Sequence, residues 1–336
     1  MRPILAVLGG LLVLAVLVSL SVGQFVIPPS VWLHPGDPRY IVLTELRLPR
    51  TLLAVMVGGA LSLSGAVLQG YSRNALADPG VLGVSSMASA GAVIVLYFGL
   101  SAASPWLLPV GAAAGAATGA GLLMLLAGLS ESATTFILAG VILSTLGGAV
   151  TALALSLAPG PWAQAEILNW LMGSLTDRSR EEAVLAAPFI AVGCGLMFSL
   201  APALDALSLG ETGARGLGVS LPSTRALLVL SVALATGASV AVSGVIGFVG
   251  LITPHLLRPF VGARPGALLG PSLLGGALML VCADTLVRLL PTPQELKLGV
   301  AMAALGAPFF LAVLVRGGVL AKGSQAKGSQ AGGPKG

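Results

Sequence analysis

Residues 46–70 read LRLPRTLLAVMVGGALSLSGAVLQG, and this stretch decides the fold class. From Thr51 to its end it contains no charged side chain, and about 20 apolar residues are enough for a helix to cross the hydrocarbon core of a bilayer. Pro49 suits the first turn of a helix, where a missing N–H group does no harm. The stretch therefore predicts a membrane-spanning helix over residues 49–70.

The composition of the whole chain agrees with lipid as its solvent. Of the 336 residues, 56% are hydrophobic and 9% are charged, against roughly 45–50% and 25% in soluble domains. A net charge of +5 does not indicate nucleic-acid binding, because the Arg and Lys residues are scattered among apolar runs. Cys194 and Cys282 also lie in apolar runs, which is typical of core side chains rather than of metal ligands or a disulfide.

Repeated apolar runs separated by Gly, Pro and charge predict an all-α polytopic membrane protein with about ten spanning helices. The first run lacks a signal-peptide cleavage pattern, so we interpret it as a span. Gly111, Gly115 and Gly119 recur at four-residue spacing, which predicts close packing against another helix. The predicted spans are 4–24, 49–70, 80–100, 105–127, 133–157, 183–202, 225–243, 245–260, 267–290 and 296–315.

The chain divides into a transmembrane domain, residues 1–316, and a polar low-complexity tail, residues 317–336. The tail cannot bury a core and is predicted to be disordered. An even number of spans puts both termini on one side of the membrane. Ten Lys and Arg residues then fall on the terminal side and seven on the other, which favours cytoplasmic termini.

Arginines gather at the predicted outer ends of two spans. Arg47 and Arg50, three residues apart, share one helix face at the start of the second span. Snorkelling to the membrane surface and pairing with a partner's carboxylate are both open interpretations. Asp284 and Arg288, four residues apart, could form an internal ion pair and add a third arginine to the same side.

Two further stretches are too irregular to serve only as spans. In residues 72–86, SRNALADPGVLGVSS, the positions Asn74, Leu76 and Asp78 would stand where a pathway meets the cytoplasm, although simple chain reversal is the alternative. Residues 242–260, VSGVIGFVGLITPHLLRPF, are rich in Gly and Pro. Irregular backbone at membrane depth is tolerated only where protein or a water-filled cavity surrounds it.

The longest polar interruption on the cytoplasmic side is DALSLGETGARGLGVSLPSTR, residues 205–225. Glu211 and Arg215 stand four residues apart in the order that stabilises a helix. Leucines in the segment offer apolar contacts, so a pair of short surface helices is expected. The segment is either a solvated loop or a docking element for a soluble partner.

Several functional classes lack their usual motifs. No GxxxxGK[ST] sequence occurs, so the chain has no ATP site of this kind. HExxH, GxSxG and paired intramembrane carboxylates are also absent, which argues against an enzyme and against a proton relay. An ion-driven secondary transporter, which would be expected to show inverted repeats, and a structural membrane scaffold stay open as alternatives.

Five motifs occur in order along the chain: LRLPRTLLAVMVGGALSLSGAVLQGYSRNALADPGVLGVSS, WLMGSLTDRS, LSLGETGARGLGV, GVIGFVGLITPHLLR and LGAPFFLAVL. Together they resemble the permease family of type II ATP-binding-cassette importers for cobalamin, haem and ferric siderophores, over residues 1–316. The resemblance implies a ten-helix permease fold that works as a homodimer or as paired related subunits. Its expected partners are two cytoplasmic ATPases and a periplasmic binding protein. ATP and Mg would bind to the ATPases, with no cofactor or metal on this chain.

The resemblance also implies roles for individual residues. Arg47, Arg50 and Arg288 match periplasmic arginines that pair with glutamates of the binding protein. Two cytoplasmic constrictions are matched by Asn74 and Leu76 and by Ala133 and Thr134. Ala75 and Lys297 depart from prolines that are usual in the family. Residues 205–222 are similar to ATPase-coupling helices, with Leu207, Leu209, Gly210, Glu211, Arg215, Leu217 and Gly218 as the coupling positions.

We therefore expect a permease of the bacterial inner membrane whose cargo is an iron complex, a ferric siderophore or haem, with cobalamin as the alternative. ATP binding would close the ATPases, move the coupling segment and rearrange the dimer interface. A pathway lined by small, weakly polar groups suits a large chelate, because strong binding would impede exit. Changing Arg47 and Arg50 together to Glu is expected to abolish docking and leave the fold intact.

Overall fold

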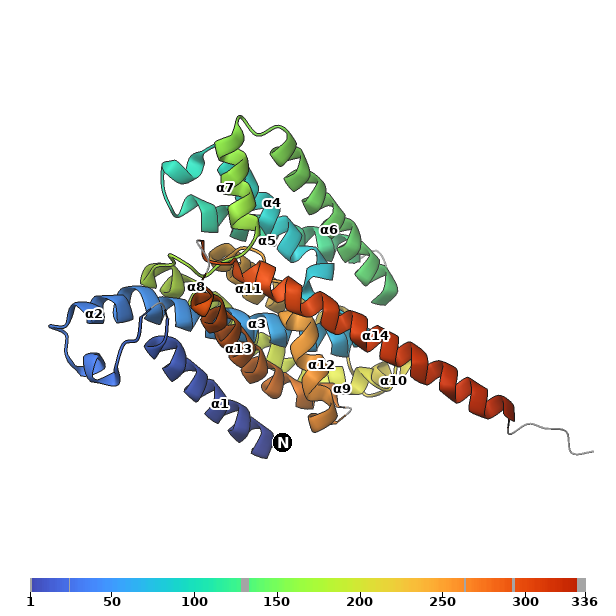
Figure 1. The fold of residues 1–336 in the computed structure, drawn as a ribbon. Coiled ribbons are helices and arrows are strands. Elements are labelled where there is room, and N and C mark those ends of the chain that lie inside the picture. The colour runs from blue at the N-terminus through green and yellow to red at the C-terminus, as the bar shows by residue number, and fades with distance from the viewer. Residues whose placement is uncertain (1, 24, 128–132, 263, 292–293, 331–336) are drawn as a thin grey trace, which may run out of the picture.

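The computed structural model describes residues 2–23, 25–127, 133–262, 264–291 and 294–330, and every regular element in these ranges is helical (Figure 1). The α-helices are α1 (Arg2–Ser21), α2 (Pro38–Ile41), α3 (Leu48–Ser72), α4 (Val84–Tyr97), α5 (Leu107–Ala127), α6 (Ala133–Ser156), α7 (Pro161–Leu171), α8 (Arg180–Ser199), α9 (Ala201–Leu207), α10 (Glu211–Gly216), α11 (Leu221–Ser243), α12 (Val249–Val261), α13 (Pro265–Leu289) and α14 (Leu298–Gln330). Short 3-10 helices η1 (Pro29–Leu33), η3 (Pro79–Leu82) and η4 (Leu100–Ala102) and a π-helix η2 (Val42–Arg47) connect them.

The predicted spans are confirmed as helices. Among the described residues, 7 helices are long and apolar enough to cross a membrane, and α4 and the Leu298–Val313 part of α14 are shorter apolar helices. With α12, these helices occupy all the predicted spans. The hydropathy of the sequence was sufficient to find them, because each span must satisfy its own backbone hydrogen bonds in lipid.

Helix α3 is the centre of the structure. It packs against α13, α12, α8 and α11 (Figure 1), and of the apolar helices it is the most buried, whereas α1 is the least. Its close contact with α13 depends on glycine, because a Cβ atom at Gly58 would collide with the backbone of Gly276. The start of the helix uses Pro49 in its first turn, as the sequence predicts.

The glycine face predicted within residues 105–127 is confirmed. A Cβ atom at Gly115 would collide with the carbonyl oxygen of Met87 on α4, and one at Gly111 would collide with Val95. Helices α4 and α5 therefore approach closely along this face. The face serves helix packing, which is the role expected from the sequence.

The structure differs from the predicted spans in four places. Residues 78–83 and 244–248 are not α-helical, so α4 and α12 are shorter than the predicted spans 80–100 and 245–260. Helix α7 lies in a region that the sequence analysis left without a helix. Helix α14 continues to Gln330, within the segment 317–336 predicted as a disordered tail, since extending an existing helix requires no new nucleus. The division into a permease domain and a tail stays a prediction.

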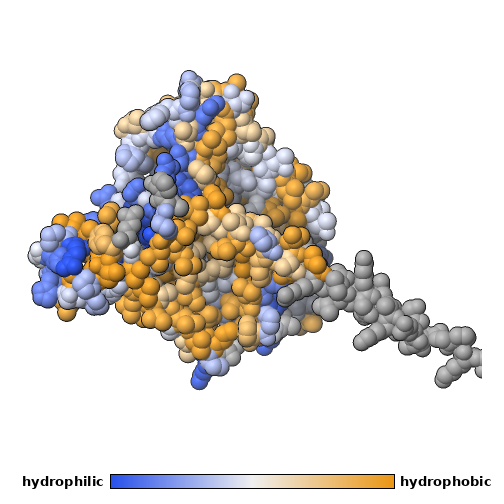
Figure 2. Space-filling view, viewed as in Figure 1, coloured by the Kyte–Doolittle hydropathy of each residue, from blue (hydrophilic) through white to orange (hydrophobic). Residues whose placement is uncertain are grey.

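The outer surface carries the apolar side chains that a lipid environment requires. Val13 and Leu14 on α1 and Val184 on α8 are exposed. Figure 2 shows hydrophobic residues over much of the visible face, with hydrophilic residues at the end of the molecule around α2 and in the upper part of the view. An exposed apolar area of this extent is typical of a surface that contacts lipid or another protein.

Candidate functional site

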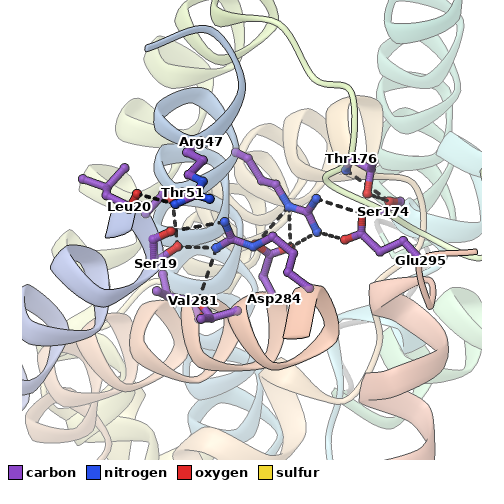
Figure 3. A network of polar contacts seen from close by, with 12 residues as sticks. Ser19, Leu20, Arg47, Thr51, Ser174, Thr176, Val281, Asp284 and Glu295 are labelled. Carbon is purple, nitrogen blue, oxygen red and sulfur yellow. Dashed lines mark hydrogen bonds and ion pairs between the residues drawn. The ribbon is translucent and has the colours of Figure 1, made fainter. Parts of the chain in front are cut away.

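Three guanidinium groups meet where α1, α3 and α13 end or begin. Arg47 precedes α3, Arg50 lies in its first turn, and Arg288 lies in the last turn of α13. We call these residues, with Asp284 and Glu295, the arginine cluster (Figure 3). The structure thus brings together all three arginines that the sequence analysis selected.

Arg47 is buried, with 6% of its surface exposed. Its Nη1 donates to the carbonyl oxygen of Leu20 at 3.0 Å and its Nη2 to that of Phe25 at 2.6 Å. The guanidinium also lies 5.0 Å from the centre of the Phe25 ring. Arg47 therefore satisfies a carbonyl group of the last turn of α1, where a cation also complements the helix dipole, and one in the connection that follows α1.

Arg50 divides its donors between two carboxylates. Its Nε donates to the two oxygens of Asp284 at 2.9 and 3.0 Å, while Nη1 donates to Glu295 at 3.2 Å and Nη2 also pairs with Glu295. The Asp284 side chain is 1% exposed and that of Glu295 is 27% exposed. The Asp284 pair is thus the inner, fixed one, and the Glu295 pair is the outer one.

Arg288 completes the cluster and connects it to α1. Its Nε forms an ion pair with Asp284 at 3.2 Å, which confirms the internal pair that the sequence spacing suggested. Its Nη1 donates to the carbonyl oxygen of Ser19 at 3.2 Å and its Nη2 to the Thr285 hydroxyl at 3.3 Å. Asp284 therefore bridges two arginines, and removing one partner of a buried ion pair is strongly destabilising because it leaves the other charge uncompensated.

Glu295 is the member of the cluster that the sequence analysis missed. It lies in the connection between α13 and α14. Burial opposes the ionised form, but hydrogen bonds and charge from Arg50 outweigh burial and hold the pKa of Glu295 below its ordinary value. The sequence held only an indirect signal for Glu295. Three arginines were expected on one side of the membrane with Asp284 as their one recognised acid, and this imbalance pointed to a second acid nearby.

The contacts of Arg47 and Arg50 change one expectation from the sequence. Glutamate at position 47 would face two carbonyl oxygens, and glutamate at position 50 would face Asp284 and Glu295. Uncompensated negative charge in these buried positions is strongly destabilising. We therefore expect the double charge reversal to disturb the fold rather than leave it intact, and docking needs a different test.

A cavity of about 410 Å³ lies between the two irregular backbone stretches, residues 78–83 and 244–248. Its lining includes side chains of Ser85, Ser86, Ser89, Thr151 and Phe248. Small hydroxyl-bearing and apolar groups dominate this surface, as expected of a pathway that does not hold its cargo strongly. The two stretches that interrupt the helices thus border a cavity, which is where irregular backbone is tolerated at membrane depth.

Local hydrogen bonds hold the first of these stretches. The Asp78 side chain accepts from the backbone N–H of Gly80 at 2.8 Å and caps η3. The Ser144 hydroxyl of α6 donates to the carbonyl oxygen of Gly80 at 2.9 Å.

The second irregular stretch, residues 244–248, ends at Phe248, directly before α12. Phe248 has a φ of 68°, a conformation that is uncommon for a bulky residue.

The two predicted cytoplasmic constrictions lie on different segments of the chain. Asn74 and Leu76 form a tight turn after α3, in which the Asn74 side chain accepts from the N–H of Leu76 at 2.9 Å, and both side chains are exposed. Thr134 lies exposed at the start of α6, whereas the side chain of Ala133 lies outside the described part of the structure. Their role as a gate stays a prediction.

Of the pair of short helices expected in the segment 205–222, α10 lies within it, whereas α9 begins earlier, at Ala201, and only its last turn belongs to the segment. Gly210 and Gly218 border α10 with φ values of 92° and 84°, which side chains other than glycine rarely adopt. Leu209 is 70% exposed and Leu217 is 64% exposed. These two leucines form an exposed apolar pair on an otherwise polar segment, which we call the leucine pair.

The other coupling positions differ in exposure. Glu211 begins α10 and Arg215 lies in its last turn, the arrangement that the helix dipole favours. Leu207, in contrast, is 2% exposed and belongs to the hydrophobic core, so it packs the segment onto the membrane helices instead of facing outward. Asp205 fixes the segment to α13, because its side chain accepts from the N–H of Gly266 at 2.8 Å.

Comparisons with known proteins cover nearly the whole chain. A model of the FecCD transport family matches residues 11–316. The Fe(3+) dicitrate transport system permease protein FecD of Escherichia coli (strain K12) is 39% identical, over 89% of this chain and 94% of that protein. The vitamin B12 import system permease protein BtuC of Vibrio cholerae serotype O1 is 40% identical, over 91% of this chain and 92% of that protein. A solved structure of a metal-chelate type ABC transporter in an inward-facing conformation has a TM-score of 0.86 and 32% identity, over 94% of this chain and 100% of that chain.

Proposed function

Because the chain belongs to the FecCD transport family, we propose that it is the permease subunit of an ATP-binding-cassette importer for a bulky metal chelate. A ferric siderophore or haem is the proposed cargo, carried from the periplasm to the cytoplasm, with cobalamin as the second candidate. Family members are transport permeases and not catalytic enzymes. The similarity to FecD and BtuC supports this class of cargo and does not favour an ion-driven secondary transporter.

The leucine pair is the observation that carries the proposal. Leu209 and Leu217 stand exposed on a short segment between two membrane helices, α8 and α11. Apolar side chains on a polar protrusion are typical of a docking surface for another protein. We propose that two cytoplasmic ATPases, which bind ATP and Mg, dock on this segment in a transporter that contains a second permease copy.

The remaining parts of the transporter follow from this assignment. We propose an inner-membrane location with both termini in the cytoplasm, since α9 and α10 must then face the ATPases. ATP binding would move the segment and rearrange the interface between permease copies. The 410 Å³ cavity, with its weakly polar lining, would lie beside the route of the cargo.

The docking of the ATPase is tested with Leu209→Ser combined with Leu217→Ser. We expect the variant to fold and to lose co-purification with the ATPase, because the change removes exposed apolar surface without opening the core. Leu33→Ser is the control, since Leu33 is also exposed, at 83%, but belongs to η1 beside α2, at the end of the molecule away from α9 and α10 (Figure 1). An unchanged yield of the ATPase complex from the double variant would contradict this surface assignment.

A periplasmic binding protein is proposed to dock at the arginine cluster. Among the described residues, Arg50 and Arg288 pair with the carboxylates of Asp284 and Glu295, whereas Arg47 is bonded to carbonyl oxygens, so the five-residue cluster carries one positive charge in excess. Positive potential of this kind favours an acidic partner surface. Since Arg50 pairs with the partly exposed Glu295, a partner's carboxylate would compete with Glu295 for the outer donors of Arg50.

Glu295→Gln tests this docking site without reversing a buried charge. We expect the variant to bind the acidic binding protein more tightly by about fivefold, which corresponds to about 1 kcal/mol. Glu181→Gln is the control, because it removes one exposed negative charge on the same side but outside the cluster. Equal affinity changes for both variants would show that only net charge matters. The cargo itself is identified by measuring ATP-dependent uptake into proteoliposomes with a ferric siderophore, haem and cobalamin.

A further inference from the structure

Three buried side chains outside the sites described above, those of Arg225, Tyr71 and Phe136, contact one another next to the coupling segment. Arg225 of α11 donates from Nε to the Tyr71 hydroxyl of α3 at 2.9 Å, and its guanidinium lies 5.4 Å from the centre of the Phe136 ring of α6. The rings of Tyr71 and Phe136 pack edge to face with centroids 5.4 Å apart. The exposed fractions are 6% for Arg225, 4% for Tyr71 and 0% for Phe136.

Each member of this cluster stands beside a different segment with a proposed role in transport. Arg225 follows the coupling segment 205–222 in the first turns of α11. Tyr71 lies in the last turn of α3, directly before the turn that holds Asn74 and Leu76. Phe136 lies in the first turn of α6, two residues after Thr134. The cluster is therefore the place where the coupling segment and both predicted constrictions are joined.

Side chains, rather than a broad helix interface, make this connection between α11 and α6. Helix α11 packs mainly on α8, α5, α3 and α4, whereas α6 packs mainly on α4, α5 and η3. The contact between Arg225 and Phe136 thus links two helices that otherwise pack on common neighbours. A planar guanidinium can hold a hydrogen bond at one edge and stack on a ring with its face, which a lysine ammonium cannot do.

We propose that Arg225 is a positioning residue that transmits movement of the coupling segment to the start of α6. The inference rests on the proposed ATPase docking at 205–222. A displacement of the segment moves the first turns of α11, and Arg225 carries that movement to Tyr71 and Phe136 through its hydrogen bond and ring contact. Both predicted constrictions then respond to one event at the ATPase.

The test is Arg225→Lys in the assembled transporter, measured by hydrogen exchange with and without ATP. In the wild type, we expect ATP to change exchange in both 205–222 and the start of α6, residues 133–140. In the variant, the change in 205–222 should persist, and the change in 133–140 should fall at least about fivefold, the lower end of usual coupling strengths. Tyr71→Phe keeps the ring contact, removes the hydroxyl acceptor and should give a smaller loss.

Arg264→Lys is the matched control. Arg264 pairs with Asp205 of the same segment at 3.1 Å, but its side chain is 81% exposed, so its replacement should leave both responses unchanged. A normal ATP response at 133–140 in Arg225→Lys overturns the inference. Equal loss of response in both segments also overturns it, because that result indicates a purely structural role. Failure of the wild-type chain to bind an ATPase instead refutes the proposed function.

Discussion

Asp284 is the residue whose replacement should damage the arginine cluster most. Its side chain is buried, accepts two hydrogen bonds from Arg50 and forms an ion pair with Arg288. Asp284→Asn keeps the size of the side chain and removes its charge. Arg50 and Arg288, whose side chains are 11% and 8% exposed, would then face each other with only Glu295 to balance them.

The expected loss is about 3 kcal/mol of stability. Removing one partner of a buried ion pair usually costs about 3–5 kcal/mol, and the lower value applies because the asparagine oxygen can still accept a hydrogen bond and Glu295 stays in place. The apparent Tm should fall by roughly 6–12 °C, by the scaling of about 2–4 °C per kcal/mol known for domains of 150–250 residues. Tryptophan fluorescence of the chain in detergent during heating measures this shift.

Asp37→Asn provides the comparison. Asp37 also forms an ion pair with an arginine, at 2.7 Å to Arg39, but this pair lies at the surface, so the Tm should stay within the error of the wild type. If Asp284→Asn unfolds at the same temperature as Asp37→Asn, the ion pairs of the arginine cluster do not hold α3 to α13, and the reasoning is refuted.

Three other results are expected. The pKa of Glu295 is lowered in the folded chain, so ionised Glu295 stabilises the fold at pH values above 4.5, the ordinary pKa of this carboxyl, and this stabilisation is lost as the pH falls below 4.5. Glu295→Gln should remove this pH dependence of Tm. An identical pH profile of Tm for the variant and the wild type would contradict the prediction. Gly65→Ala should lower the yield of folded protein, because its Cβ would collide with a carbonyl oxygen of α12, whereas Gly9→Ala meets nothing within 4 Å and should express normally. Thr151→Trp fills part of the cavity and should reduce uptake without loss of ATPase binding, while Thr145→Trp on the exposed face of α6 should not, and equal uptake by the two variants would exclude the cavity from the route.

The sequence alone was enough for the features that depend on local pattern. Apolar length predicted each spanning helix, since a segment in lipid must satisfy its own backbone and its length is fixed by the bilayer. Gly111 and Gly115 indicated a close helix contact because small residues at four-residue spacing lie on one face. Glycine and polarity over 205–222 likewise predicted α10 but not the start of α9 at Ala201, and the helical spacing of Asp284 and Arg288 already suggested their ion pair.

Tertiary structure decided which distant groups meet. Arg50 pairs with carboxylates 234 and 245 residues away, and no periodicity in the sequence assigns such partners. Leu207 and Leu209 look alike in sequence, yet one is buried and the other exposed, because Leu207 ends α9, which packs on α13 and α3, whereas Leu209 lies in the turn after it. The connection from Arg225 to Tyr71 and Phe136 has the same origin. Hydropathy is a property of one segment, whereas burial and charge pairing belong to the packed set of helices.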